Sequence, residues 1–307
     1  MALEIYENNT LKYTFPRVLS ATLADHLSGE RTLSFSVLAS RSQSLQTGMT
    51  VKLDGQYYNI VRISKQITDG FPITTAECEH ISYLLNDEKY NLITFVFEGT
   101  PLEGLHELLD DTPFSIGVCE ATGRIECYFT EGTLNRRNAL MRLIDACGCD
   151  VEYDGYRINL RKHRGSTVRK ILMDGENVTN LSVTMDSREN IASYSISLFK
   201  MADLQAGDEV NITCTPMGIN VNTRIVSITY NPFYRYTVQI EVVIMFRTSW
   251  RPRQRSLTGS SRNSVRQTVN CARPSKRLRG ICLNFSRRYL VSTCVFPMRK
   301  ARYRNFR

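Results

Sequence analysis

Hydrophobic and polar residues alternate with a period of two along several stretches of the first 95 residues. The clearest stretches are residues 32–38 and 73–80, and this spacing is typical of a strand with one buried face. Two further strand-like runs flank Asp54 and Gly55, a pair that tolerates the positive φ angles of a tight hairpin turn. Residues 1–95 therefore predict an antiparallel β domain of the barrel or sandwich type.

The spacing of apolar residues becomes helical after residue 96. Thr100 is placed to be an N-cap, Pro101 to be the first helical residue and Glu103 to complete a capping box. The apolar stripe of this helix comprises Leu102, Leu105, Leu108 and Leu109. The sequence therefore predicts an amphipathic helix here, with a defined start.

A second helix is predicted from about residue 133 to a stop at Gly148. Its apolar stripe comprises Leu140, Leu143, Ile144 and Cys147. Two short strands, at residues 114–118 and 124–129, lie between the helices, and a hairpin turning at Asp154 and Gly155 follows the second one. Residues 96–165 therefore predict a small α+β module.

The pattern returns to strands beyond this module. Predicted strands cover residues 181–185, 191–198, 209–214, 224–230 and 236–244. The order of β, α+β and β predicts a mainly β fold interrupted by a small α+β insert. We accordingly expect a first β domain over residues 1–95, an inserted domain over 96–165, a second β domain over 166–244 and a tail over 245–307.

Charge separates the tail from the rest of the chain. The 307 residues carry 39 Lys and Arg against 30 Asp and Glu, but residues 245–307 hold 15 Arg, 2 Lys and no acid. The preceding residues are left with 22 basic and 30 acidic side chains. An acidic body does not suggest general affinity for nucleic-acid backbones.

The N-terminus and the cysteines bear on where the protein is located. The sequence shows no basic n-region followed by an apolar segment and no apolar run near 20 residues, which predicts neither a signal peptide nor membrane insertion. Nine cysteines without framework spacing are typical of reduced thiols.

Few residues are arranged as a metal or cofactor site would require. The four histidines are scattered, and Cys78 with His80 and Cys147 with Cys149 are the candidate metal fragments. A structural zinc site normally needs four such ligands, so we interpret Cys78 as a core thiol and His80 as an exposed imidazole. We expect no metal and no cofactor.

Carboxylates cluster at two places in the sequence. The clusters are Glu107, Asp110 and Asp111, and Asp150, Glu152 and Asp154. A hydrolase with paired carboxylates needs two acids that converge across a cleft, whereas neighbours at a helix end or in a hairpin are usually solvated. We interpret both clusters as surface and predict no catalytic residues.

The segment from residue 134 to 165 carries a family resemblance. Its sequence, LNRRNALMRLIDACGCDVEYDGYRINLRKHRG, has a helix with a small-residue stop and then an acidic hairpin at residues 152–156. An INL strand and a basic exit at Arg164 and Gly165 complete it. Three earlier pieces occur in family order: ERTLSFSVLA, VKLDGQYYNI and ECEHISYLLND. Over about residues 1–244 the chain resembles the bacteriophage tail family called prophage tail endopeptidase, or phage minor structural protein, N-terminal region.

The resemblance implies a tail-hub-like protein built from antiparallel barrel domains. In such proteins three copies form a ring below the distal tail protein. It therefore implies a structural, non-catalytic component of the tail tip or baseplate, in a virion assembled in the bacterial host cytoplasm. The implied partners are further copies of the chain, the distal tail protein and other tail-tip proteins, with no small-molecule substrate, nucleic acid or membrane insertion. In longer members, peptidase activity belongs to C-terminal extensions.

Two alternatives stay open from the residues alone. One is a tail-associated peptidoglycan hydrolase, an endopeptidase, which would need a convergent set of Cys and His or a metal site. The other is nucleic-acid binding through the Arg-rich tail, which predicts an affinity that falls steeply with salt.

The tail itself has a second interpretation. The family resemblance ends near residue 244, where an acidic helix would be expected. Alanine and glutamate codons that are read in a neighbouring frame can give arginine codons. We therefore interpret residues 245–307 as a frameshift product, disordered and without function, and the alternative is a designed basic arm. Stop codons in the neighbouring frame of the gene would contradict the frameshift.

Overall fold

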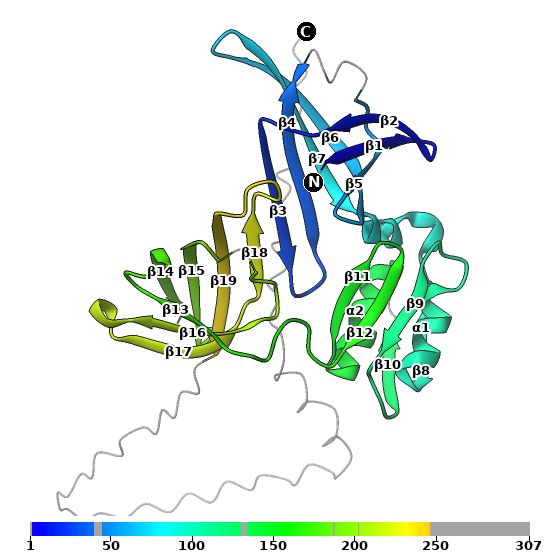
Figure 1. Ribbon diagram of the computed structural model, residues 1–307. Helices are drawn as coiled ribbons and strands as arrows, with labels where there is room; N and C mark the ends of the chain where they lie inside the picture. The colour runs from blue at the N-terminus through cyan, green and yellow to red at the C-terminus, as the bar shows by residue number, and fades with distance from the viewer. Residues whose placement is uncertain (1, 40–44, 130–133, 187, 202, 246–307) are drawn as a thin grey trace, which may run out of the picture. The chain divides into compact units, whose positions relative to one another are not determined.

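The computed structural model describes residues 2–39, 45–129, 134–186, 188–201 and 203–245 (Figure 1). Both interpretations of the tail lie outside these residues from residue 246 onward. Met245 is the last residue of a strand.

Eleven antiparallel strands form the largest sheet. Their order is β14-β15-β19-β18-β3-β4-β7-β6-β5-β1-β2. The strands are β1 Leu3–Glu7, β2 Thr10–Phe15, β3 Ser20–His26, β4 Arg31–Leu38, β5 Thr50–Leu53, β6 Gln56–Thr68, β7 Phe71–His80, β14 Val178–Asp186, β15 Ile191–Phe199, β18 Ser227–Tyr230 and β19 Thr237–Met245. Pairing of β18 with β3 joins the strands before the α+β module to those after it. The mainly β, antiparallel fold predicted from the sequence is confirmed.

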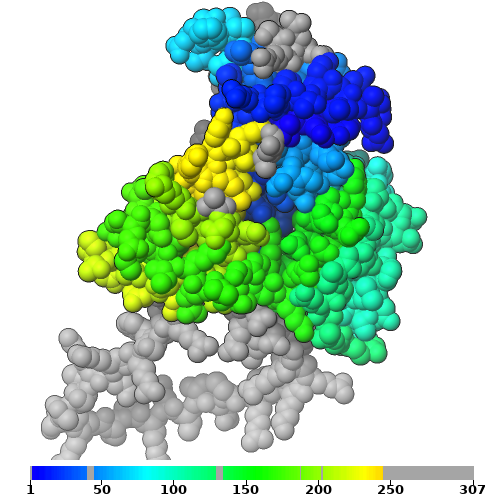
Figure 2. Space-filling model, in the orientation of Figure 1, coloured from blue at the N-terminus to red at the C-terminus, as the bar shows by residue number. Residues whose placement is uncertain are grey.

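Turn chemistry fixes the local register of the hairpins. Asp54 and Gly55 have φ angles of 51° and 76°, as the predicted hairpin turn between β5 and β6 requires. The longer hairpin of β6 and β7 extends beyond the body of the sheet, and its turn region projects at the top of Figure 2. Ile67 and Phe71 near this turn are 76% and 63% exposed, so the hairpin presents apolar side chains to solvent.

A second sheet of three strands covers part of the first. Its order is β13-β16-β17, with β13 Lys170–Met173 parallel to β16 Glu209–Cys214, and β17 Ile219–Arg224 antiparallel to β16. Apolar residues of β16, including Val210 and Ile212, pack with Ile196 of β15 and Ile240 of β19 in one buried cluster. The sequence pattern predicted β16 but missed β13 and β17.

The α+β module consists of two helices and two small sheets. Its elements are β8 Phe95–Gly99, α1 Pro101–Leu109, β9 Ser115–Cys119, β10 Ile125–Phe129, α2 Arg136–Cys147, β11 Asp150–Asp154 and β12 Arg157–Arg161. Strand β8 pairs with β10, and the other sheet has the order β11-β12-β9. Within that sheet β12 and β9 are parallel. The chain reaches β8 through the 3-10 turns η2 Ile81–Asn86 and η3 Glu88–Tyr90, and a third such turn, η4 Thr215–Met217, precedes β17.

Both helix starts follow from local hydrogen bonding. The Thr100 hydroxyl accepts from the Glu103 N–H at 3.4 Å, and the Glu103 carboxylate accepts from the Thr100 N–H at 2.8 Å. The predicted capping box of α1 is therefore confirmed. Asn135 caps α2 through a 2.7 Å bond from the Asn138 N–H, and Gly148 ends α2 in the left-handed conformation, as predicted.

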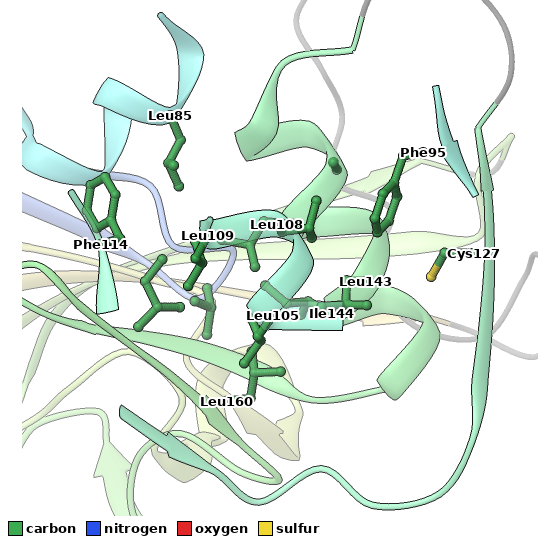
Figure 3. Close-up of a cluster of buried hydrophobic side chains, with 14 of the residues drawn as sticks. Leu85, Phe95, Leu105, Leu108, Leu109, Phe114, Cys127, Leu143, Ile144 and Leu160 are labelled. Carbon is green, nitrogen blue, oxygen red and sulfur yellow. The ribbon is translucent and has the colours of Figure 1, made fainter. Parts of the chain in front are cut away.

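The two helices share a core with the module's sheets (Figure 3). Leu105, Leu108 and Leu109 of α1 lie against the stripe of α2 in this cluster. Leu140 of α2 is completely buried. The prediction for Leu102 is wrong, because this side chain is 45% exposed. Pro101 and Gly104 occupy the inner face of the first turn instead.

The domain boundaries predicted from the sequence stay a prediction. Three buried clusters follow the three predicted segments closely, but Ile81 and Leu85, which precede residue 96, pack in the cluster of the α+β module. The described residues form one compact unit.

Candidate functional site

His80 is buried, not exposed as the sequence interpretation held. Its ring lies between those of Tyr58 and Tyr153, at centroid distances of 5.6 and 5.4 Å. Alternation in β7 places it on the same face as Cys78, and that face is the core. Tyr153, in the β11–β12 hairpin that covers this end of the strand, lies 73 residues further along the chain, so alternation alone could not reveal the burial of His80.

Both nitrogens of the His80 ring have partners. Nδ1 accepts from the Ser82 N–H at 3.2 Å, so the neutral ring carries its proton on Nε2. That nitrogen donates to Gln56 Oε1 at 3.1 Å, and the same oxygen accepts from the Gly155 N–H at 3.1 Å. Burial, together with the charges of Arg31, Arg137 and Arg164, lowers the pKa of His80 to about 3. The ring is therefore a neutral linker between β7 and the β11–β12 hairpin.

Arg137 of α2 completes this contact. Its guanidinium donates to the Ser82 hydroxyl at 2.9 Å and to the Gly29 carbonyl at 2.9 Å, and it lies 4.0 Å from the centre of the Tyr83 ring. The residue is 6% exposed. A buried arginine with these partners attaches the helix to the turn between β3 and β4.

The metal candidates do not converge. Among the described residues, no group of three or more His, Cys, Asp or Glu side chains is placed to hold a metal ion. Cys78 is a buried thiol, as predicted. Burial raises the pKa of Cys78, and burial with neighbouring thiols raises the pKa of Cys147 to about 12. Such thiols are poor nucleophiles near neutral pH.

The first acid cluster is surface, but Asp150 of the second cluster is buried, while Glu152 is half-buried and Asp154 is exposed. Glu107, Asp110 and Asp111 are exposed. Asp150, interpreted from the sequence as solvated, is 4% exposed. It accepts from the Arg164 N–H at 2.8 Å and from Arg224 Nη2 at 2.6 Å. The Asp150 carboxylate can be buried because two other segments of the chain pair with it: the backbone N–H of Arg164 donates to it, and Arg224 supplies the positive charge.

Arg164 is the centre of the junction between the modules. Its guanidinium forms an ion pair with Asp25 of β3 and donates to the His26 carbonyl at 3.1 Å. Its own carbonyl accepts from Arg224 at 3.1 Å. One residue thus contacts β3, the start of β11 and the end of β17. Its burial and pairing explain why a basic exit follows β12.

Two glycines allow the backbones to meet at this point. Gly165 has a φ angle of 86°, and Gly207 has one of 95°. A Cβ at Gly207 would lie 2.1 Å from the Arg164 carbonyl oxygen, and one at Gly165 would lie 2.5 Å from the Asp208 nitrogen. Residues with a side chain rarely adopt these φ angles, and a Cβ would clash at both positions. Both the backbone conformation and the close approach therefore require glycine.

Asp208 binds the strand that leaves the junction. Its carboxylate accepts from the Ser166 N–H at 2.6 Å and from Lys170 Nζ at 3.0 Å. Burial lowers the pKa of Lys170, but bonds to Asp208 and Asp203 outweigh that effect and leave the pKa above its ordinary value. We refer to Asp25, Asp150, Arg164, Asp208 and Arg224 as the polar junction.

Arg164 and Gly165 carry part of the family resemblance, but their sequence context does not reveal their role. Asp25, Asp208 and Arg224 could not be predicted as site residues, because isolated charged residues in strands and turns form no recognisable sequence pattern. In the polar junction the buried carboxylates are held by arginine, lysine or backbone donors. Such a site is suited to fixing the geometry of modules, since buried and paired charges restrict alternatives.

None of the helices in the described ranges is both long and apolar enough to span a bilayer.

Comparisons with known proteins identify the fold. Residues 5–80 match the family model described as the prophage endopeptidase tail N-terminal domain. A sequence comparison with curated proteins finds no match.

Solved structures are similar over most of the chain. The prophage tail protein gp18 of Listeria monocytogenes matches with a TM-score of 0.62 and 14% identity, covering 79% of this chain and 94% of that one. A tail protein of Neisseria meningitidis matches with a TM-score of 0.60 and 10% identity, covering 79% and 96%. The tail protein of prophage MuSo2 from Shewanella oneidensis matches with a TM-score of 0.60 and 8% identity, covering 80% and 98%.

Residues 5–80 thus match the N-terminal domain of the prophage endopeptidase tail family, and the chain has the fold of solved prophage tail proteins.

Proposed function

We propose that the protein is a structural hub component of a phage tail tip, which joins the distal tail protein to the tip in the virion. The observation that carries this proposal is the extent of the shared fold. About four fifths of this chain matches 94–98% of the length of three prophage tail proteins. The polar junction fits the same role, because a hub subunit has to hold its modules in one geometry.

The free edges of the large sheet support assembly into a ring. Strands β14 and β2 are the two edges in the described part of the chain, and β14 is nine residues long with a single charge, Asp186. Long edge strands invite pairing with another chain. Two different edges on one subunit favour a head-to-tail interface, which closes into a ring when the rotation allows it. We propose a trimer.

A non-catalytic role is part of the proposal. It is supported by the bonding of two residues that could otherwise act in catalysis. Both ring nitrogens of His80 are hydrogen-bonded within the core, and Asp150 is paired with Arg224. A cell-wall zymogram of the full chain tests the alternative, and a cleared band that depends on this chain would refute the non-catalytic role.

The mass of the full chain in solution tests the ring. We expect light scattering to give three times the 35.1 kDa mass of one chain. With the distal tail protein of the same phage present, the mass should be that of three chains plus the bound partner. A monomer at all concentrations, with and without that protein, would refute the hub role.

A pair of lysine substitutions tests the edge. Ser182→Lys combined with Thr184→Lys adds charge to exposed positions of edge strand β14 and should weaken the ring. Gln239→Lys is the matched control, because Gln239 is exposed but lies on the inner strand β19, between β15 and β18. If the control weakens the ring as much as the edge variant, the β14 edge is not the interface.

A further inference from the structure

An open groove lies on the face of the β11-β12-β9 sheet that the helices do not cover. Its volume is about 580 Å³. The polar side chains and the glycine that line it are Ser115, Gly117, Asp154, Arg157, Asn159 and Arg161. Alternation along β12 explains this lining, since Ile158 and Leu160 point into the core of the module and the residues between and beside them point to the other face.

The two arginines of the groove differ in their surroundings. Arg161 is already paired, with ion pairs to Glu120 at 2.9 Å and Glu152 at 3.0 Å. Arg157 is exposed, and no ion pair or hydrogen bond to its guanidinium is found within the ranges that the structure describes. The groove therefore contains one guanidinium with five N–H donors open to a ligand.

Asn159 adds a second donor beside Arg157. The residue is 6% exposed, and its Oδ1 accepts from the Val118 N–H at 2.7 Å. Because only the amide oxygen can accept from a backbone N–H, the amide orientation is fixed and Nδ2 is the free donor. No partner of Nδ2 occurs among the described residues. Nδ2 reaches solvent at the groove, so it is open to a ligand that accepts a hydrogen bond.

Gly117 makes this arrangement possible. A Cβ at this position would lie 2.0 Å from Asn159 Oδ1 and 3.1 Å from Arg157 Cγ. A side chain here would displace the Asn159 amide, so the glycine is needed to hold that amide in place.

The groove also borders a free strand edge. Strand β9 is the outer strand of its sheet and pairs only with β12 among the described strands. An extended peptide can add to such an edge through its backbone, while its alternate side chains enter the adjacent groove. Donors predominate there, so the side chain that fits is an acceptor with negative charge.

We propose that this groove binds an extended peptide segment of a partner protein, with an Asp or Glu carboxylate on Arg157 and Asn159 Nδ2 and the peptide backbone along β9. A guanidinium and a carboxylate can form two parallel charge-assisted hydrogen bonds. Asp154, at the rim, disfavours a segment with a second acid at that end, so the site selects the position of the carboxylate as well as its charge. This site goes beyond the hub role and holds whether or not the chain forms a ring.

Fluorescence anisotropy with two labelled peptides tests the site in the full chain. The probe is Val-Thr-Val-Glu-Val-Thr with blocked ends, whose β-branched residues favour an extended conformation and which carries a single carboxylate. The same peptide with Gln in place of Glu is the neutral control. We expect the acidic peptide to bind at least about tenfold more tightly, since one charge-assisted pair is worth that factor or more.

Two variants identify the residues involved. Arg157→Gln should weaken the binding of the acidic peptide about tenfold or more. Asn159→Asp keeps the shape and the acceptor for Val118 but replaces the free donor with an anionic oxygen, and it should also abolish the preference for the acidic peptide. Arg124→Gln is the matched control, because this exposed arginine pairs with Glu98 in the β8–β10 sheet, outside the groove.

Three results would overturn the proposal: no binding of the acidic peptide, equal binding of both peptides, or binding that Arg157→Gln leaves unchanged. Far-UV circular dichroism establishes that each variant is folded. An exposed Arg157 has no structural partner to lose, so a folded variant is expected. None of these readouts depends on the mass of the assembly, so failure here and failure of the hub role are distinguishable.

Discussion

The buried neutral state of His80 predicts a specific loss of stability in mild acid. In the unfolded chain the imidazole has a pKa of about 6.5, whereas in the folded protein its pKa is about 3. Between these values only the unfolded chain binds the proton, so the stability contributed by neutral His80 is complete above pH 6.5 and is lost as the pH falls. At pH 5, about 1.5 units below the ordinary pKa, the loss is about 2 kcal/mol, at about 1.36 kcal/mol per unit.

Urea unfolding of the full chain, followed by far-UV circular dichroism at pH 7 and pH 5, measures this loss. Other titrating groups contribute to the same interval, so the comparison is with His80→Gln, which cannot titrate. We expect the wild type to lose about 2 kcal/mol more than His80→Gln between the two pH values. His106→Gln, on the exposed face of α1, is the matched control and should behave as the wild type. Equal losses for the wild type and His80→Gln would show that burial does not keep this imidazole neutral.

The remaining predictions concern the core, the junction and a helix cap, all measured as free energies of unfolding in urea. Leu140→Asp should destabilise the fold by about 3–5 kcal/mol because it buries a charge. Leu102→Asp, at an exposed position of α1, should cost under about 1 kcal/mol. Equal costs would refute the assignment of the helix faces. Gly207→Ala should cost over about 2 kcal/mol, since its Cβ meets the Arg164 carbonyl. Gly218→Ala, also at positive φ but with no atom within 4 Å of the added Cβ, should cost only about 1 kcal/mol from backbone strain. Similar costs for the two substitutions would mean that the polar junction rearranges to accommodate the Cβ added at position 207. Thr100→Ala should cost about 1 kcal/mol through loss of the capping box, and an unchanged midpoint would contradict the cap's contribution.

Local features of this protein could be predicted from the sequence because their causes are local. The hairpin turn at Asp54 depends on two adjacent residues that tolerate positive φ, and the start of α1 depends on four residues around Thr100. The end of α2 depends on Gly148, for the same reason. Alternation and helical spacing identified most of the strands and both helices. The family resemblance supplied the expectation of a tail protein, and the shared fold agrees with it.

Short or irregular strands escaped this reasoning. Strand β17 has residues that alternate only between half-buried and exposed, and β13 is four residues long. Neither gives a strong period-two signal, because their stability comes from pairing with β16 and from packing on the large sheet. Leu102 belongs to the apolar stripe of α1 in the sequence. Its exposure could not be predicted, because the surface that α2 covers is narrower than that stripe.

The tertiary structure alone decided which polar residues are buried. Asp150 and His80 each belong to a pattern that also fits a solvated surface, and their partners Arg224 and Gln56 lie 74 and 24 residues away. The groove of Arg157 and Asn159 likewise depends on the pairing of β12 with β9, across about 40 residues. Hydrophobic spacing constrains which face of an element is buried, because burial of apolar area is nondirectional and additive along the chain. The pairing of charges and donors depends on distances of about 3 Å between distant segments, and only the folded chain brings those segments together.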